Sequence, residues 1–282
     1  MIPMRIDFHT HIFPKTISEN RENYFPAEPA FSLLYRSPKS TLVGAEQLLE
    51  AMDQNEVDKS VVFGFPWINS QLIRRHNDYV VDVVSKHSDR FIGFGCVNPA
   101  DKDAAAETQR CLDGGMLGIG ELAFYQSGID DAILRHLEPI MTICRSRKAP
   151  VLIHTNEPVG HFYPGKTPIS LTQIYQLIRQ FPENAIVLAH WGGGLFFFNL
   201  LKREVKDSLK NVYFDTAASP FLYDTEIYQL AMKLIGIDKI LFGSDYPLLP
   251  PKRYFKEMEA AGLSKNEIKS ICGLNAAKVL GV

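Results

Sequence analysis

Short apolar runs alternate with longer amphipathic segments along nearly the whole chain. Each run is short, almost continuously apolar and rich in β-branched residues, which is typical of strands buried on both faces in a parallel sheet. The pattern predicts eight strands, at residues 5–8, 59–65, 90–97, 116–122, 150–154, 185–190, 211–216 and 239–243. The segments between these runs carry apolar residues at helical spacing. They predict helices at residues 44–55, 71–87, 103–113, 129–147, 170–181, 195–208 and 223–235, with three short helices at 254–261, 265–272 and 275–280.

This alternation of eight strands with helices over 282 residues predicts an α/β fold, a (β/α)₈ TIM barrel. One domain spanning residues 1–282 is expected, because no linker or low-complexity segment divides the chain. A doubly wound open sheet is the alternative. No G-x-G-x-x-G turn follows the first predicted strand to support it.

Residues 12–43 interrupt the pattern. Four prolines in this segment prevent a long helix, and its several aromatic residues argue against disorder. We expect it to form a lid or a wall of a substrate site.

Polar residues that can bind a metal ion stand at the ends of six predicted strands. They are His9 and His11, Glu121, His154, His190, Asp215, and Asp245 after the last strand. In a TIM barrel the carboxyl ends of the strands meet at the face that holds the active site. Residues two apart on a strand point to the same side, so His9 and His11 can aim at one point. Two surface histidines are the alternative for this pair taken alone. The histidines at 76, 87 and 136 lie on predicted helices and are expected to be ordinary surface or capping residues.

The composition of the chain argues against some classes of function. The net charge of −2 gives no indication of a basic surface that would bind nucleic acid. No apolar run reaches the roughly 20 residues that span a bilayer, and the first residues lack the apolar core of a signal peptide. Four widely spaced cysteines predict reduced and mostly buried thiols. We therefore expect a cytoplasmic protein with a small-molecule substrate. A homodimer is left open.

Five motifs, in this order along the chain, carry a resemblance to a known family. They are Asp7-Phe-His-Thr-His11, His87-Ser-Asp-Arg-Phe-Ile-Gly93, Val187-Leu-Ala-His-Trp-Gly-Gly193, Phe242-Gly-Ser-Asp-Tyr-Pro247 and Asn275-Ala-Ala-Lys-Val-Leu280. With these motifs the chain resembles the amidohydrolase superfamily, and within it the amidohydrolase-related branch that contains aminocarboxymuconate-semialdehyde decarboxylase-like enzymes. The resemblance implies a metal-dependent TIM-barrel hydrolase, or a lyase on the same site.

The resemblance also implies roles for individual residues. His9, His11, His154 and Asp245 match the metal ligands of the family. His190 matches a histidine that assists catalysis in members with one ion and binds the second ion in members with two. Glu121 stands where many members carry a bridging carboxylated lysine or a glutamate, so it is expected to be a ligand or a near neighbour of the ion. A second interpretation makes Glu121 a structural carboxylate.

The chemistry of these residue types supports an enzyme. Imidazole and carboxylate ligands suit Zn²⁺, which is the first expectation, while Mn²⁺ and Fe²⁺ stay open. One ion is expected rather than two. An ion with an open position lowers the pKa of a bound water to about 7. Asp245 would take a proton from it, and His190 would orient a carbonyl or protonate a leaving group. Asp215 is either a hydrogen-bond partner of a catalytic histidine or a plain surface residue.

The loop at residues 156–166 is predicted to bind substrate. Its His161, Tyr163 and Lys166 offer hydrogen-bond donors, and Lys166 in particular suits a carboxylate. A solvent-exposed turn is the alternative. Trp191 is expected either to form a wall of the pocket or to pack in the core. The first function expected is hydrolysis of a small carboxylate-bearing amide, lactone or ester. The alternative is a nonoxidative decarboxylase or hydratase on the same metal site.

Overall fold

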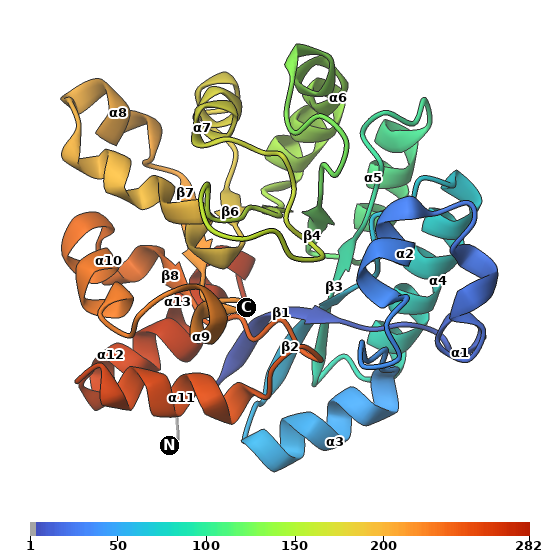
Figure 1. Ribbon diagram of the computed structural model, residues 1–282, viewed down its shortest axis with the longest axis horizontal. Coiled ribbons are helices and arrows are strands. Elements are labelled where there is room, and N and C mark those ends of the chain that lie inside the picture. The colour runs from blue at the N-terminus through green and yellow to red at the C-terminus, as the bar shows by residue number, and fades with distance from the viewer. Residues whose placement is uncertain (1–3) are drawn as a thin grey trace.

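The computed structural model, which describes residues 4–282, is a nearly closed barrel of eight parallel strands with helices between them (Figure 1). The strands pair in chain order from first to last. They are β1 (Ile6–His11), β2 (Lys59–Phe63), β3 (Phe91–Gly95), β4 (Gly118–Leu122), β5 (Val151–Ile153), β6 (Ile186–Leu188), β7 (Val212–Asp215) and β8 (Ile240–Leu241). The TIM-barrel prediction is confirmed.

The barrel closes between β1 and the segment after β8 by backbone hydrogen bonds. Phe8 N donates to Phe242 O at 2.8 Å, and His11 N donates to Tyr246 O at 2.9 Å. Asp245 N returns a bond to His9 O at 2.9 Å. These bonds bring the first and the last motif of the chain side by side.

The predicted helices are present with some changes at their ends. The helices between and after the strands are α3 (Ala45–Asn55), α4 (Ser70–Lys86), α5 (Ala104–Asp113), α6 (Asp131–Arg147), α7 (Leu171–Gln180), α8 (Arg203–Ser208), α9 (Ser219–Leu222), α10 (Ile227–Ile235), α11 (Pro251–Ala260), α12 (Lys265–Lys269) and α13 (Asn275–Leu280). A 3₁₀ turn η3 (Ile237–Lys239) precedes β8, and a π-helical turn η4 (Ser270–Leu274) joins α12 to α13.

The helix predicted at 195–208 was wrong in its first half. That stretch belongs to η2 (His190–Leu200), a 3₁₀ segment that begins with five residues in the left-handed region. Gly193, at φ 61°, lies so close to Asn156 that an added Cβ would be 2.3 Å from the Asn156 carbonyl oxygen. Only glycine fits there, and the close contact brings the loops after β5 and β6 together.

Residues 12–43 form short helices rather than a plain loop: α1 (Lys15–Ser18), η1 (Arg21–Tyr24) and α2 (Pro29–Tyr35). No long helix forms, as the prolines predict. The segment builds its own aromatic cluster, in which Phe31 packs on Phe13, Phe65 and Trp67 with ring centroids 4.6–6.1 Å apart. This small core fixes α2 beside the ends of β1 and β2.

Two register shifts interrupt the strand pairing, one in β1 and one in β4. In β1, Asp7 pairs with Ser60 but Thr10 pairs with Val62, so β1 has one extra residue there. In β4, Ile119 pairs with Val151 but Leu122 pairs with Ile153. An extra residue reverses which side chains face inward beyond it. The alternation of inward-facing and outward-facing side chains therefore changes just before the polar residues of these two strands.

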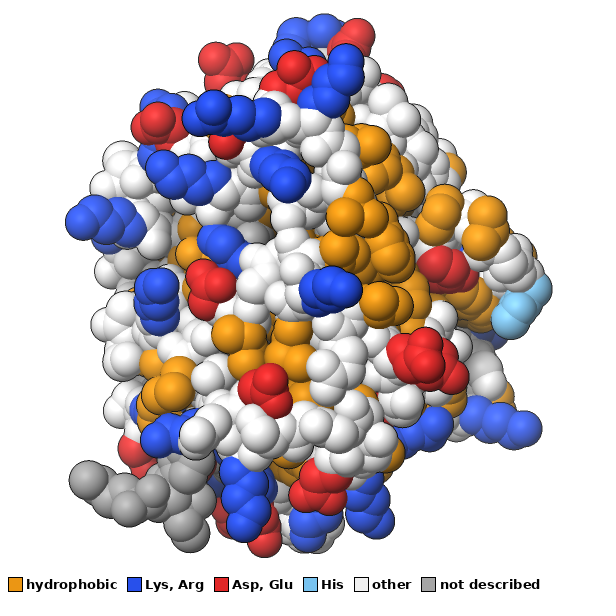
Figure 2. Space-filling view, turned by 90° about the vertical axis from the view of Figure 1, so that its left-hand side faces the viewer, with side chains coloured by type: hydrophobic (Ala, Val, Ile, Leu, Met, Phe, Trp, Pro, Cys, Tyr) orange, Lys and Arg blue, Asp and Glu red, His pale blue; other side chains and the backbone are white. Residues whose placement is uncertain are grey.

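Figure 2 shows apolar side chains gathered on the flank that carries α8 and α10. η2 contacts both helices and exposes Phe197 and Leu200, and Leu201 directly after it is exposed as well. Apolar patches of this kind often mark contacts with another protein. A homodimer stays open. Within residues 4–282, no helix has the length and apolar character needed to cross a membrane. The four cysteines are buried and form no disulfide.

We predict that Phe94→Ala lowers the free energy of unfolding by about 3–5 kcal/mol, because the change leaves a cavity inside the barrel. The Phe94 ring is fully buried, packs edge-on against Phe8 at 5.6 Å and fills the space beside Gly118. Urea unfolding followed by circular dichroism measures the effect. Phe162→Ala is the control: its ring is 70% exposed, so a loss under about 0.5 kcal/mol is expected. Equal losses in the two variants would contradict the packing assigned to Phe94.

Candidate metal centre

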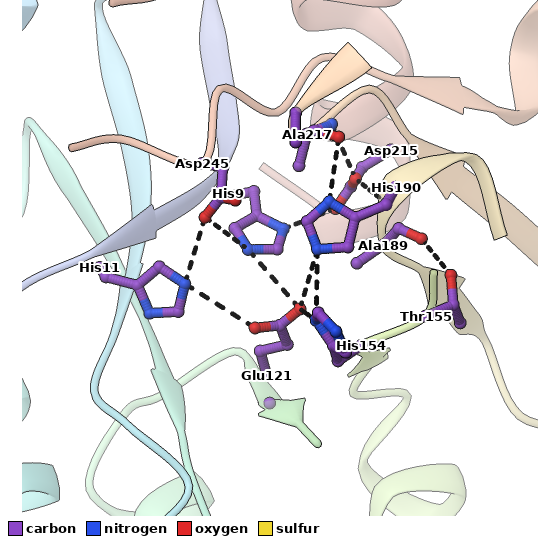
Figure 3. A network of polar contacts seen from close by, with 12 residues as sticks. His9, His11, Glu121, His154, Thr155, Ala189, His190, Asp215, Ala217 and Asp245 are labelled. Carbon is purple, nitrogen blue, oxygen red and sulfur yellow. Dashed lines mark hydrogen bonds and ion pairs between the residues drawn. The ribbon is translucent and has the colours of Figure 1, made fainter. Parts of the chain in front are cut away.

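Six polar side chains from five strands or their ends meet at the carboxyl end of the barrel (Figure 3). They are His9, His11, Glu121, His154, His190 and Asp245. Three overlapping groups have ligand atoms within 4.8 Å of one another: His9 with His11 and Glu121, His9 with His190 and Asp245, and Glu121 with His154 and His190. The structure therefore brings together every metal-binding and catalytic residue expected from the sequence.

The two register shifts explain why these side chains can meet. Ile6 and Phe8 belong to the cluster that fills the barrel interior, so an unbroken strand would turn His9 away from it. The extra residue in β1 restores an inward direction for His9 and His11, and the one in β4 does the same for Glu121. β-bulges commonly re-aim side chains beside functional sites.

The four imidazoles share one hydrogen-bonding arrangement. In each ring, one nitrogen faces an oxygen that can only accept a hydrogen bond. His9 Nδ1 faces Asp215 Oδ2 at 2.8 Å, His11 Nδ1 faces Gly64 O at 3.2 Å, His154 Nε2 faces Gly165 O at 2.9 Å, and His190 Nδ1 faces Ala217 O at 3.0 Å. These nitrogens must carry the hydrogen. In the neutral rings, the other four nitrogens then present lone pairs to the centre, as metal ligands do.

The inward-facing atoms lie at distances that suit a shared cation. Asp245 Oδ1 is 3.5 Å from both His9 Nε2 and His11 Nε2, and Glu121 oxygens lie 3.7 Å from the same two nitrogens. Two ligands about 2.1 Å from one ion at the tetrahedral angle are about 3.4 Å apart. His9 Nε2 is also buried with no hydrogen-bond partner. A divalent ion would satisfy this atom, so the residues present fit a metal ion.

The pKa shifts of His9 and Glu121 also indicate that the centre favours positive charge. Burial, the largest effect, opposes charge on His9, but the negative charges of Asp215, Glu121 and Asp245 together raise its pKa to about 10. Burial likewise opposes charge on Glu121, yet His154 and His9 hold the pKa of its carboxyl well below its usual range. Without an ion the centre therefore binds protons, and metal binding would release them.

Asp215 and Asp7 hold the ligands in place from behind. Asp215 is fully buried and accepts from His9 Nδ1 and, through Oδ1 at 2.9 Å, from His190 N. The surface alternative for Asp215 was therefore wrong. Asp7 Oδ1 accepts from His9 N and Ser244 N, which links the two ligand-bearing ends of the chain. The sequence analysis missed this role of Asp7, although an acidic residue two positions before an H-x-H motif was its signal.

His190 and Asp245 sit at strained backbone positions. Their φ angles are 55° and 58°, in the left-handed region that non-glycine residues seldom adopt. The hydrogen bonds from His190 N to Asp215 and from Asp245 N to His9 O hold them there. Strain of this kind clusters at functional sites.

The remaining predicted residues are placed as follows. Lys166 Nζ bonds Glu157 Oε1 at 2.7 Å and Val159 O at 2.6 Å, and Tyr163 donates to Glu157 Oε2 at 2.7 Å. His161 is exposed beside Tyr163.

Two further aromatic residues are buried away from the centre. Trp191 is fully buried against Tyr228 and Phe196 and donates to Ser219, which favours core packing over a pocket wall. His76, expected on the surface, is buried: it donates from Nε2 to Ile12 O and accepts from Trp67.

Residues 6–282 match the amidohydrolase family. The chain belongs to this family. The 2-amino-3-carboxymuconate-6-semialdehyde decarboxylase of Dictyostelium discoideum is 23% identical to it, over 99% of this chain and 92% of that protein. The gamma-resorcylate decarboxylase of Rhizobium sp. (strain MTP-10005) is 25% identical, over 63% of this chain and 66% of that protein. The amidohydrolase resemblance, including its branch, is confirmed.

A solved structure gives the same fold. The 5-carboxyvanillate decarboxylase of Novosphingobium aromaticivorans, complexed with manganese and 4-hydroxy-3-methoxy-5-nitrobenzoic acid, superposes with a TM-score of 0.78. The two are 18% identical, over 100% of this amidohydrolase and 97% of that chain. The three groups of ligand atoms support a divalent metal ion. The choice of Zn²⁺ stays a prediction.

We predict that His9→Ala and Asp245→Ala each remove the bound ion, since each deletes an inward-facing ligand atom at the centre. Elemental analysis of the purified variants measures the metal content. His136→Ala, on the exposed face of α6, is the control and is expected to keep full occupancy. Full occupancy in either ligand variant would mean that the ligand set is wrong.

We predict one ion per chain, because the two inward carboxylates, Glu121 and Asp245, balance one divalent charge and a second ion would leave two buried charges uncompensated. Two ions about 3.5–4 Å apart would need a bridging ligand, and Glu121 lies between the two histidine pairs. Metal stoichiometry of the wild type and of Glu121→Gln decides. Two ions in the wild type, falling to one or none in Glu121→Gln, would overturn the prediction and make His190 a ligand.

Proposed function

We propose that this amidohydrolase is a metal-dependent, nonoxidative decarboxylase of a conjugated or aromatic carboxylic acid. The observation that carries the proposal is the likeness to a decarboxylase over 99% of the chain. A second relative by sequence and the manganese-bound structure bear decarboxylase names as well. These comparisons favour the alternative in the sequence analysis over hydrolysis of an amide, lactone or ester, which was the first expectation.

Decarboxylation makes simple demands on the site. The bond between the carboxyl carbon and the conjugated carbon breaks, carbon dioxide leaves, and the electron pair stays on the conjugated carbon, which takes up one proton. The reaction therefore requires a proton donor and a way to hold the carboxylate, with no water as a reactant. A bound divalent ion would supply Lewis acidity and would orient the carboxylate.

The side chains of the centre can meet these demands. His190 donates from Nδ1 to Ala217 O, which fixes the ring with Nε2 toward the centre. Burial opposes its charge, but Glu121 and Asp245 raise the pKa of His190 to about 8. Nε2 is therefore the nitrogen of His190 that is placed to deliver the proton taken up by the conjugated carbon. Asp245 is the most exposed of the carboxylates at the centre, with 17% of its side chain accessible.

The surroundings fit a planar conjugated substrate. The aromatic cluster of Phe13, Phe31, Phe65 and Trp67 is buried beside the end of β1 and supports the segment that carries Tyr35. Tyr125 is only half-buried, and its ring stacks on His154. An aromatic ring in this position favours a flat, conjugated molecule by ring contacts.

We predict that the metal-reconstituted protein releases carbon dioxide from an aromatic or conjugated carboxylic acid and does not open lactones, amides or esters. A substrate panel assayed with Zn²⁺ and with Mn²⁺, read by carbon dioxide release and chromatography, tests this. His190→Ala is expected to lower kcat by at least about 10²-fold, as expected for loss of a general acid. Turnover of a lactone or an amide with no carbon dioxide release would refute the decarboxylase and restore the hydrolase.

A further inference from the structure

Two tyrosines that the metal chemistry does not use stand beside the centre, one on the loop after β4 and one at the end of α2. Tyr35 and Tyr125 are both half-buried, and neither hydroxyl makes a hydrogen bond within residues 4–282. Tyr254 and Tyr228 differ, since Tyr254 donates to Ser244 O and Tyr228 donates to Glu257. The Tyr223 hydroxyl also lacks a partner among these residues, but it is buried. A half-buried phenol without a partner is a hydrogen-bond donor available to a ligand.

Tyr125 is held directly over a ligand histidine. It follows Glu121 by four residues, and its ring stacks on that of His154 with centroids 6.1 Å apart and planes 25° from parallel. The hydrogen bond from His154 Nε2 to Gly165 O fixes the ring beneath it. The Tyr125 hydroxyl is therefore presented at the edge of the centre by a fixed support.

Tyr35 lies near the His11 part of the centre. Its ring packs on Phe65, next to Gly64, whose carbonyl oxygen holds His11. The preceding residue, Leu34, lies next to Gly165, whose carbonyl oxygen holds His154. The end of α2 therefore reaches from the His11 side to the His154 side of the centre.

The electrostatics agree with this placement. Burial, and after it the negative charges of Asp245 and Glu121, raise the pKa of Tyr35. Burial likewise raises the pKa of Tyr125, with smaller effects from Glu121, Tyr35 and Asp245. Both phenols therefore lie within electrostatic range of the two carboxylates of the centre.

The cations nearest to these groups in the chain are already paired. Lys166, next to Gly165, bonds Glu157 and Val159 O. Arg36, next to Tyr35, bonds Ser32 Oγ and lies over the Phe25 ring at 5.4 Å. Neither of these two cations is therefore free to pair with a second carboxylate of the substrate.

We propose that Tyr35 and Tyr125 are specificity-determining residues that donate hydrogen bonds to hydroxyl or oxo substituents of a conjugated substrate carrying a single carboxylate. This inference rests on the proposed function for the identity of the bound carboxylic acid. The two phenols favour substrates with polar ring substituents. A second acidic group is disfavoured, because Lys166 and Arg36 are already paired with other groups of the protein.

Calorimetric titration of the Mn²⁺-loaded protein tests the inference with three probes: benzoate, 2,6-dihydroxybenzoate and benzene-1,3-dicarboxylate. The wild type is expected to bind 2,6-dihydroxybenzoate at least about 10-fold more tightly than benzoate, as two new hydrogen bonds would give. Benzene-1,3-dicarboxylate is expected to bind no more tightly than benzoate. Tyr35→Phe and Tyr125→Phe are each expected to weaken 2,6-dihydroxybenzoate by about 5- to 10-fold and to leave benzoate unchanged.

Tyr175→Phe is the matched control. Tyr175 lies on α7, its hydroxyl makes no hydrogen bond within residues 4–282, and its ring packs on Phe198 of η2. It should change no affinity, and metal content should be equal in all three variants. Equal binding of benzoate and 2,6-dihydroxybenzoate by the wild type, no binding of either, or an unchanged ratio in both centre variants would overturn the inference. Tighter binding of the dicarboxylate would also overturn it. Absence of carbon dioxide release with the binding pattern intact would refute the proposed function alone.

Discussion

The structure of this protein depends on one electrostatic constraint at the mouth of the barrel. Four imidazole lone pairs and two carboxylates converge there, and each imidazole is oriented from behind by a buried oxygen acceptor. Acceptors packed this closely repel one another unless a cation lies among them. His9 Nε2, buried without a partner, is the clearest sign of this requirement. A divalent ion bound there would satisfy these acceptors, and the residues that would hold it come from both ends of the chain.

The backbone is shaped to bring these groups together. Register shifts in β1 and β4 turn His9, His11 and Glu121 inward, and left-handed residues at His190 and Asp245 redirect two more side chains. Each irregularity is held by hydrogen bonds to a neighbouring strand, as with His190 N and Asp215. The regular strands of the barrel make the site rigid, and the irregular backbone positions direct the ligand side chains toward the centre.

The chemistry follows from what surrounds the centre. The segment between β1 and α3 packs its own aromatic core and carries Tyr35, while Tyr125 stacks on His154. Lys166, the most evident candidate for a substrate carboxylate in the sequence, is instead bonded to Glu157. The proposed decarboxylation agrees with these surroundings and with the decarboxylase names of two proteins similar in sequence.

The sequence by itself determined the barrel and its polar face. Apolar runs show which segments are buried strands, and residues such as His154 and His190 directly after such runs must lie at the carboxyl end of a parallel barrel. The sequence could not show which way His9 and Glu121 point, because an inserted strand residue is visible only against the register of the neighbouring strand. Nor could it show that His76 and Trp191 are buried or that Glu157 neutralises Lys166. Burial and ion pairing depend on side chains that folding brings together from different parts of the chain, so only the tertiary structure decides them.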